Sequence, residues 1–223
     1  MPLPAHLFPG EYKDLDSPKP LHKHSNNHRS YPIFPTDMAN SNGIVSGMNA
    51  FITGAGSGIG RAAALAYAKA GATGLAISDV NDASVAETVA LIAKQSPHVD
   101  VLALHLDTTS EQGVKEAIEQ SVAKFRRIDV AMNIAGIAHG GLTHECDFQA
   151  WKKVMDVNID GVWMCQKEEL KMMLKQEDKG YRVGRGVIIN ISSLLGLLGG
   201  PSSPYTASKH GRSQPPLILR ENY

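Results

Sequence analysis

The chain has little cysteine, no excess of one charge and no long apolar run, and each absence argues against a class of protein. Cys146 and Cys165 are the only cysteines, which excludes a disulfide framework and a cysteine-rich zinc site. Basic and acidic residues number 22 each, which disfavours a nucleic-acid-binding surface. No apolar run reaches the roughly 18 residues of a membrane span, and no secretory signal pattern begins the chain. We therefore expect a cytoplasmic protein with no nucleic-acid or membrane partner.

The first 46 residues differ in composition from the rest. Seven of the twelve prolines precede residue 36, with Ser, Asn and His between them and no apolar periodicity. Such a composition predicts a disordered extension over residues 1–46. His22, His24 and His28 are better explained as members of a polar tail than as ligands, so no metal site is predicted.

From Gly47 onward, short apolar runs alternate with segments of helical periodicity. The runs have the texture of buried parallel strands, and they read MNAFIT, GLAIS, VLALHL, DVAMNIA and GVIINIS. The segments between them place apolar residues three and four apart, and the last predicts one long helix over residues 148–176. This alternation predicts a single α/β domain over residues 47–213, a doubly wound, Rossmann-like parallel sheet with its site at the carboxyl ends of the strands.

The sequence TGAGSGIG, from Thr53 to Gly60, connects the first strand directly to the first helix. Without a Cβ atom, Gly54, Gly58 and Gly60 permit a tight turn and a close approach to phosphate at the start of a helix. The strict G-x-G-x-x-G spacing is not met, and no Gly-Lys-Ser/Thr follows, which excludes a P-loop. A purely structural turn is the alternative interpretation of this loop.

Asp79 ends the second predicted strand, nineteen residues after Gly60. A carboxylate there can accept hydrogen bonds from the adenosine ribose hydroxyls, and its charge repels a 2′-phosphate. The loop before Gly60 has no Lys or Arg to offset that repulsion. NAD is therefore favoured over NADP, with capping of the next helix as the alternative role of Asp79.

The glycine loop fits the pattern T-G-x-x-x-G-x-G, and Tyr205-x-x-x-Lys209 follows about 150 residues later. The fragments HLDTT, NIAG, VNIDGVW and NISSLLG lie between them in order. Over residues 49–211 the chain thus resembles the short-chain dehydrogenase/reductase family, in its single-domain oxidoreductase branch. The resemblance implies an NAD(P)-dependent enzyme that interconverts a small secondary alcohol and a ketone. It also implies a homodimer or homotetramer, formed through the long helix and the Tyr205 helix.

The resemblance assigns four catalytic residues. Tyr205 would be the general acid/base, since a tyrosine pKa of about 10 can be pulled toward the working pH by a nearby positive charge such as Lys209. Ser193, preferred to Ser192, would hydrogen-bond the substrate oxygen. Asn158 would hold a water that relays protons from Lys209.

The same resemblance assigns the cofactor-binding residues. Asp107 would contact the adenine, Asn133 would lie at the end of the fourth strand, and Lys209 would also bind the nicotinamide ribose. The full set is Thr53, Gly54, Ser57, Gly58, Ile59, Gly60, Asp79, Asp107, Asn133, Tyr205 and Lys209. His139, His144 and His210 belong to no motif and are not assigned.

The end of the chain departs from the family pattern. Pro215 should stop the Tyr205 helix by about Ser213, which predicts an irregular tail over residues 214–223 and leaves the fifth strand as an exposed edge. The domain is therefore expected to be C-terminally truncated, through altered splicing or a misread message, with a short functional variant as the rival explanation. The alternative function is a catalytically inactive dinucleotide- or partner-binding protein.

Overall fold

The computed structural model describes residues 43, 45–180, 183–212 and 217–219. The predicted disordered extension lies outside these residues except for Gly43, Val45 and Ser46. The strands are β1 (Asn49–Thr53), β2 (Gly74–Asp79), β3 (Asp100–His105), β4 (Val130–Asn133), β5 (Gly186–Asn190) and β6 (Leu217–Leu219). The α-helices are α1 (Gly58–Lys69), α2 (Asp82–Gln95), α3 (Glu111–Phe125), α4 (Phe148–Met155), α5 (Val162–Met173) and α6 (Ser203–Gly211). Short helical turns are η2 (Thr143–Glu145), η3 (Asp156–Gly161) and η4 (Leu194–Gly196).

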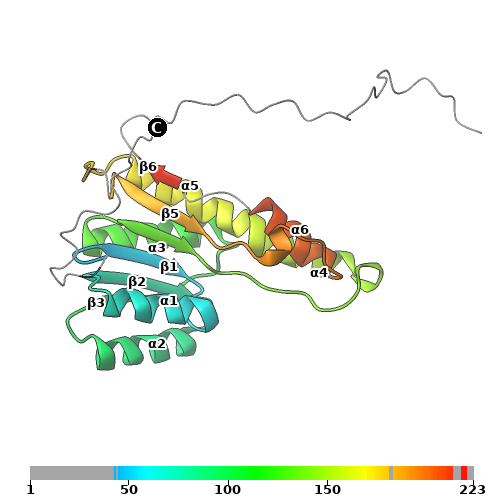
Figure 1. Cartoon of the computed structure of the whole chain (residues 1–223), viewed down its shortest axis with the longest axis horizontal. Coiled ribbons are helices and arrows are strands. Elements are labelled where there is room, and N and C mark those ends of the chain that lie inside the picture. The colour runs from blue at the N-terminus through cyan, green and yellow to red at the C-terminus, as the bar shows by residue number, and fades with distance from the viewer. Residues whose placement is uncertain (1–42, 44, 181–182, 213–216, 220–223) are drawn as a thin grey trace, which may run out of the picture. The chain divides into compact units, whose positions relative to one another are not determined.

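The strands form one sheet in the order β3-β2-β1-β4-β5-β6, and the first five are parallel (Figure 1). From β1 the chain adds β2 and β3 on one side and then crosses to add β4 and β5 on the other. The strand order therefore reverses between β1 and β4, the position where ligands bind in open α/β sheets. The predicted Rossmann-like fold is confirmed.

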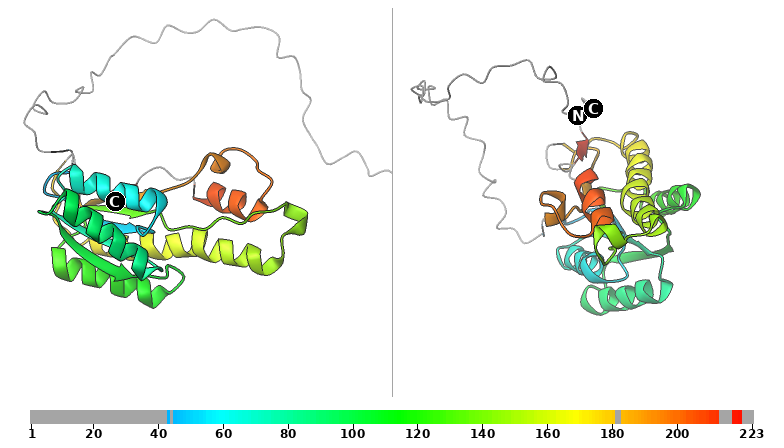
Figure 2. Two further views of the ribbon diagram at one scale, coloured as in Figure 1. Left: turned by 90° about the horizontal axis from the view of Figure 1, so that it is seen from below. Right: turned by 90° about the vertical axis from the view of Figure 1, so that its right-hand side faces the viewer.

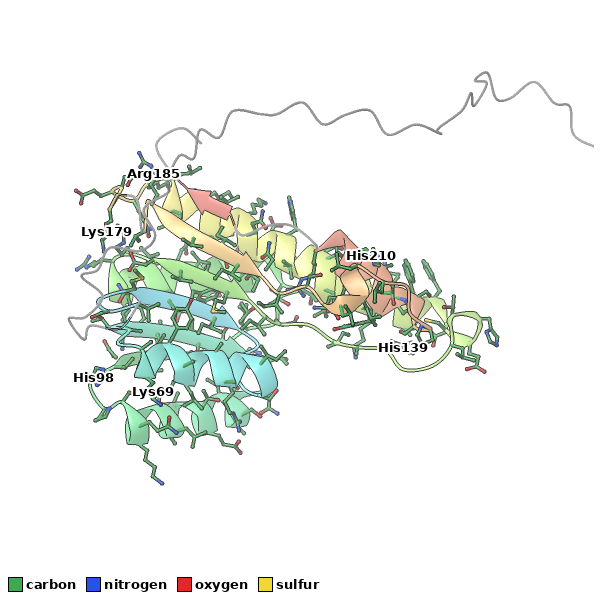
Figure 3. All side chains as sticks on the ribbon, viewed as in Figure 1. Lys69, His98, His139, Lys179, Arg185 and His210 are labelled. Carbon is green, nitrogen blue, oxygen red and sulfur yellow. The ribbon has the colours of Figure 1, made fainter. Side chains whose placement is uncertain are left out.

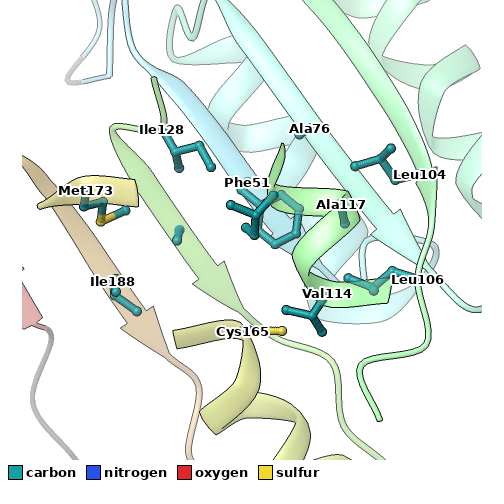
Figure 4. Packing of buried hydrophobic residues seen from close by; sticks show 12 residues of the cluster. Phe51, Ala76, Leu104, Leu106, Val114, Ala117, Ile128, Cys165, Met173 and Ile188 are labelled. Carbon is teal, nitrogen blue, oxygen red and sulfur yellow. The ribbon is translucent and has the colours of Figure 1, made fainter. Parts of the chain in front are cut away.

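Helices cover both faces of the sheet, because successive strand residues point to opposite sides. Phe51 packs with side chains of α3 and α5 in one buried cluster (Figure 4). Its neighbours Ala50 and Ile52 pack with side chains of α1 and α2 in the second cluster. The all-apolar texture of the strands is thus explained by two cores, one on each face.

The predicted long helix over residues 148–176 is instead three consecutive pieces, α4, a π-helical turn and α5, which follow one another as a rod (Figure 2). Asn158 and Gly161 are buried within the π-helical turn η3. A Cβ atom on Gly161 would lie 2.8 Å from the Thr108 hydroxyl oxygen, so the rod passes very close to the segment that follows β3. The apolar periodicity correctly predicted helical structure over this segment, but it gave no sign of the wider π-helical turn.

The end of the chain differs from its prediction in one respect. α6 ends at Gly211, as expected, but Leu217–Leu219 form β6 within the segment predicted to be irregular. β6 pairs antiparallel with β5, with Leu219 opposite Gly186 and Leu217 opposite Ile188. Over these residues β5 is therefore paired and is not an exposed edge. The apolar Leu-Ile-Leu run has a composition that suits a strand.

Replacing Phe51, which is fully buried, by alanine should lower the free energy of unfolding by about 3–5 kcal/mol, because it removes packing and leaves a cavity. The control is Leu197→Ala at a side chain that is 75% exposed, where the change should stay within about 0.5 kcal/mol. Urea denaturation of the three proteins measures both values. Equal losses in the two variants would contradict the assignment of the core.

Candidate dinucleotide-binding and catalytic site

A cavity of about 730 Å³ lies at the carboxyl ends of the parallel strands. Most of the predicted site residues line it, namely Gly54, Ser57, Gly58, Ile59, Gly60, Asp79, Asp107, Tyr205 and Lys209. The glycine loop and the Tyr205–Lys209 helix, far apart in the sequence, therefore face the same space. Four predicted residues do not line it: Thr53, Asn133, Asn158 and Ser193.

The glycine loop has a geometry that side chains would prevent. Gly54 and Gly58 adopt φ angles of +68° and +48°, which L side chains rarely adopt. A Cβ atom on Gly60 would lie 2.0 Å from the carbonyl oxygen of Gly54. The loop leads into the N-terminus of α1, whose free N–H groups and dipole favour a phosphate group.

The carboxylate of Asp79 is held at the end of β2 by two backbone N–H groups. Oδ2 accepts from Gly56 N at 3.0 Å and Oδ1 accepts from Asn81 N at 3.1 Å. The N-cap of α2 is Asn81, whose side chain accepts from Ser84 N. Capping of α2 is therefore not the role of Asp79, which instead presents a fixed acceptor to the cavity.

Arg61 was not predicted, although it immediately follows the last glycine of the loop. Its guanidinium donates to the carbonyl oxygen of Gly56 and to Glu87 Oε2 at 2.8 Å, and its Nε donates to the Thr88 hydroxyl at 3.0 Å. These bonds join the glycine loop to α2. The only sequence signal for this link between the loop and α2 was a basic residue in the first turn of α1.

Thr53 and Asn133 are buried behind the residues that line the cavity. Thr53 is buried at the end of β1, and its Oγ1 accepts from the backbone N–H groups of Ile134 and Ala135 at 3.1 and 3.2 Å. Asn133 is fully buried at the end of β4, and its Nδ2 donates to Asn190 Oδ1 at 3.0 Å. Thr53 therefore fixes the backbone at the switch point of the sheet, and Asn133 joins the ends of β4 and β5.

Asn133 also belongs to a buried polar cluster that the sequence did not reveal. Its Nδ2 donates to Oε2 of Glu169, a residue of α5 that is fully buried. Burial raises the pKa of the Glu169 carboxyl to about 8, although the hydrogen bond from Asn133 opposes this shift. The four-residue spacing of Cys165, Glu169 and Met173 was the available signal that this carboxyl faces the core.

Tyr205 and Lys209 lie one helical turn apart on α6. The Lys209 ammonium lies 5.5 Å from the centre of the Tyr205 ring and donates to Ile191 O at 3.0 Å. Lys209 is only 5% exposed, and burial, followed by the charge of Arg212, lowers its pKa to about 8. The pair thus places a phenol beside an amine whose pKa lies near 8.

The two candidate serines have different surroundings. Ser192 lines the cavity, and its hydroxyl donates to the carbonyl oxygen of Lys209 at 2.8 Å. Ser193 caps η4, where its Oγ accepts from Leu195 N at 3.2 Å. In that bond the Ser193 oxygen is the acceptor, so its hydroxyl hydrogen is not used.

Asn158 connects the loop after β4 to α6. Its Oδ1 accepts from Ile137 N at 2.8 Å, and its Nδ2 donates to Ile137 O at 2.9 Å and to the Ser208 hydroxyl at 3.0 Å. Ser208 directly precedes Lys209. Asn158 therefore positions α6 beside the cavity.

No group of three His, Cys, Asp or Glu residues within the described part of the chain is arranged to hold a metal ion. His22, His24 and His28 lie outside the described residues. Figure 3 places His210 on α6 and His139 in the loop after β4, and His210 is exposed and bonded to Thr206 O. Neither lines the cavity.

None of the described helices combines the length and apolarity that a membrane crossing would require.

The sheet order and the glycine loop at its switch point define a Rossmann-like protein. A family model described as short chain dehydrogenase matches residues 48–214. The chain therefore belongs to the short-chain dehydrogenase family, a family of oxidoreductases that use NAD(P).

Three known proteins illustrate the similarity. The 3-oxoacyl-[acyl-carrier-protein] reductase FabG of Thermotoga maritima is 37% identical over 171 residues, covering 75% of this chain and 64% of the relative. The crystal structure of levodione reductase superimposes with a TM-score of 0.68 at 32% identity, covering 74% of this chain and 62% of that one. A short chain dehydrogenase/reductase from Burkholderia phymatum in complex with NAD has the same TM-score and identity, covering 75% and 57%. The chain thus spans about three-fifths of the length of these relatives.

The free energy of unfolding should fall as the pH rises from about 4.5 to about 8. In that range the folded state keeps a proton on Glu169, whereas the unfolded state, with the ordinary value of 4.5, has lost it. Glu169→Gln should flatten this dependence, and Glu119→Gln at an exposed carboxyl of α3 should not. Urea denaturation at pH 5, 6.5 and 8 measures the slopes, and equal slopes for the parent and Glu169→Gln would contradict the prediction.

Proposed function

We propose that the chain is an NAD(P)-dependent oxidoreductase that interconverts a secondary alcohol and a ketone by hydride transfer. The observation that supports this function best is the shared cavity, because Tyr205 and Lys209 line the same space as the glycine loop. A general acid/base thus lies within reach of a substrate held beside the dinucleotide. Family membership supports the same class of reaction.

The residues of the cavity fit a dinucleotide. Gly54, Gly58 and Gly60 form a cradle that a Cβ atom would fill, and they would hold the diphosphate at the N-terminus of α1. By resemblance, Asp107 would contact the adenine and Lys209 the nicotinamide ribose.

NAD is the cofactor that we favour. The Asp79 carboxylate would accept hydrogen bonds from the adenosine ribose, and its charge would repel the 2′-phosphate of NADP. The nearby Arg61 guanidinium is already bonded to Glu87 and to Gly56, so it would not neutralise that phosphate.

The proposed chemistry divides between cofactor and protein. When bound, the nicotinamide supplies or accepts the hydride at the carbinol carbon. Tyr205 takes the hydroxyl proton during oxidation and returns it during reduction, and the Lys209 charge beside its ring favours the phenolate. Ser193 donates a hydrogen bond to the substrate oxygen. Asn158 anchors α6 and, by resemblance, would order the water that returns protons to Lys209.

The proposed partners are a small alcohol or ketone and further copies of this chain. Phe148 and Trp163 of the α4–α5 rod are 69% and 59% exposed, which supports a homodimer or homotetramer through this rod. Cys146 and Cys165 are free thiols, which supports a cytoplasmic location.

Tyr205→Phe should lower the turnover of ketones by about 10²–10⁴-fold, because it removes the proton donor, while NADH should still bind through the glycine loop, Asp79 and Lys209. A fluorescence titration with NADH and with NADPH measures binding, and a panel of cyclic and acyclic ketones measures turnover. Tighter binding of NADPH than of NADH would contradict the cofactor preference. Binding without turnover by the parent chain would favour the alternative, a catalytically inactive dinucleotide-binding protein.

Ser193→Ala should lower kcat by about 10²–10³-fold, the usual loss for one oxyanion donor. Ser192→Ala should cost less, because the Ser192 hydroxyl hydrogen is directed at Lys209 O. Steady-state kinetics of both variants with the best ketone of the panel measure the effect. A larger loss in Ser192→Ala would transfer the donor role to Ser192.

A further inference from the structure

Thr88 of α2 is a polar residue at a core position. The buried residues of α2 are Val85, Thr88 and Ile92, and their spacing of three and four places them on one face of the helix. Thr88 is fully buried. Valine has nearly the shape of threonine, so packing does not require a hydroxyl here, and a buried hydroxyl is unfavourable without a hydrogen-bond partner. The role of Thr88 therefore follows from its hydrogen bonds.

The hydroxyl of Thr88 is bonded to the glycine loop. It accepts from Arg61 Nε at 3.0 Å, and its single hydrogen has two acceptors within reach, Ala55 O at 3.0 Å and Ser84 O at 3.1 Å. Ser84 O already accepts from Arg61 Nη2 at 3.3 Å, so we assign the hydrogen to Ala55 O. Thr88 thus connects α2 directly to the backbone of the loop.

Arg61 holds the next carbonyl of the loop. Its Nη2 donates to Gly56 O and to Glu87 Oε2 of α2, the latter at 2.8 Å. The carbonyls of two successive loop residues are therefore tied to α2, that of Ala55 directly through Thr88 and that of Gly56 through Arg61.

The N–H groups of the same two loop residues are also bonded. Ala55 N donates to Ser78 O at 2.9 Å, and Gly56 N donates to Asp79 Oδ2 at 3.0 Å. Both acceptors belong to the last two residues of β2. The backbone of Ala55 and Gly56 is thus fixed by β2 through its N–H groups and by α2 through its carbonyls.

This fixed segment leads into the N–H groups that would bind the diphosphate. The N-cap of α1 is Ser57, whose side chain makes no capping hydrogen bond. The first N–H groups of a helix have no partner within it, and a phosphate group can accept from them. Their direction depends on the turn at Gly58, which has a φ angle of +48° and lies two residues after Gly56. A shift of Ala55 and Gly56 would therefore turn these N–H groups away from the diphosphate.

We propose that Thr88 is a positioning residue of the dinucleotide site. Together with Arg61, its hydroxyl holds the carbonyls of Ala55 and Gly56, so that the glycine loop keeps the shape in which its N–H groups face a diphosphate. This role rests on the proposed function, in which the loop binds the cofactor.

The first measurement follows the shape of the loop without any ligand. The bonded amides of Ala55 and Gly56 exchange their hydrogens with solvent only when the loop opens. Thr88→Val should speed this exchange by about tenfold, because Ala55 O loses its donor in a buried site, while the amides of β1 should exchange as in the parent. Thr88→Ser keeps the hydroxyl, so it should exchange at nearly the parent rate. Hydrogen exchange followed by NMR measures each amide.

The second measurement follows NADH. Thr88→Val should raise the KM for NADH by about tenfold and leave kcat unchanged, since a displaced loop weakens binding equally in the ground state and the transition state. Thr88→Ser should restore the KM. A general loss of folded protein would instead lower the apparent kcat and leave the KM unchanged. Steady-state kinetics with the best ketone of the panel measure both constants.

Ser121→Ala is the matched control. Ser121 is likewise fully buried on a helix, α3, where its hydroxyl donates to Ala117 O at 2.7 Å. It does not line the cavity, so the loop exchange and the KM should stay those of the parent. Circular dichroism establishes that each variant is folded. Should Thr88→Val fail to fold, Arg61→Met, which removes the donor to Gly56 O at a side chain that is 27% exposed, replaces it in the same measurements.

Unchanged exchange of the Ala55 and Gly56 amides in Thr88→Val would overturn the proposal, as would equal acceleration in Ser121→Ala or in Thr88→Ser. Faster exchange with an unchanged KM for NADH would overturn it too, because the loop would then open without any effect on the cofactor. NADH binding by the parent chain is measured separately by fluorescence. A parent chain that does not bind NADH would refute the proposed function, and the exchange rates would still decide whether Thr88 holds the loop.

Discussion

The backbone of residues 133–137, directly after β4, is the constraint on which the site depends. Thr53 bonds it from the end of β1, Asn158 from the π-helical turn and Arg212 from the end of α6. These three segments are far apart in the sequence and meet only because the parallel strands end at the same edge of the sheet. The cavity wall is therefore held by side chains that do not themselves face a ligand.

The same edge explains why the buried polar groups of this protein gather there. The strands supply apolar side chains to both faces, but beyond the last ladder hydrogen bond their backbone groups need other partners. Asn133 and Asn190 end two neighbouring strands and bond each other, and Glu169 joins them from α5. A protonated Glu169 adds a donor to a cluster in which Asn133 Oδ1 has no partner among the described residues. The free energy of unfolding thus depends on pH through Glu169, a core residue next to the switch point.

Much of the fold could be predicted from the sequence, because it depends on local patterns. Strand and helix periods predicted the five parallel strands, and the glycine loop predicted the tight entry into α1. The Tyr205–Lys209 spacing predicted a pair on one helix face, and α6 shows it. Each of these features depends on residues close together in the sequence, or on a pattern of apolar and polar residues that repeats along one helix or strand.

What could not be predicted depends on partners distant in the sequence. Asn133 was assigned to the cofactor site, and nothing in its position at the end of a short strand indicated that its amide donates to Glu169 of α5. β6 forms because β5 presents free backbone groups to an apolar run that shows no periodicity of its own. Arg212 resembles an ordinary tail residue until the carbonyls after β4 are placed beside it. Long-range contacts of this kind leave no local signal.

The π-helical turn has a consequence for how this segment can change in evolution. A π turn corresponds to an α-helix with one inserted residue, and each residue turns an α-helix by about 100°. Deleting one residue between Asp156 and Gly161 would make a continuous α-helix and rotate α5 by that angle relative to α4. Glu169 would then leave the core while α4 kept its place beside the cavity. The insertion thus sets the phase between the part of the rod that serves the cavity and the part that serves the sheet.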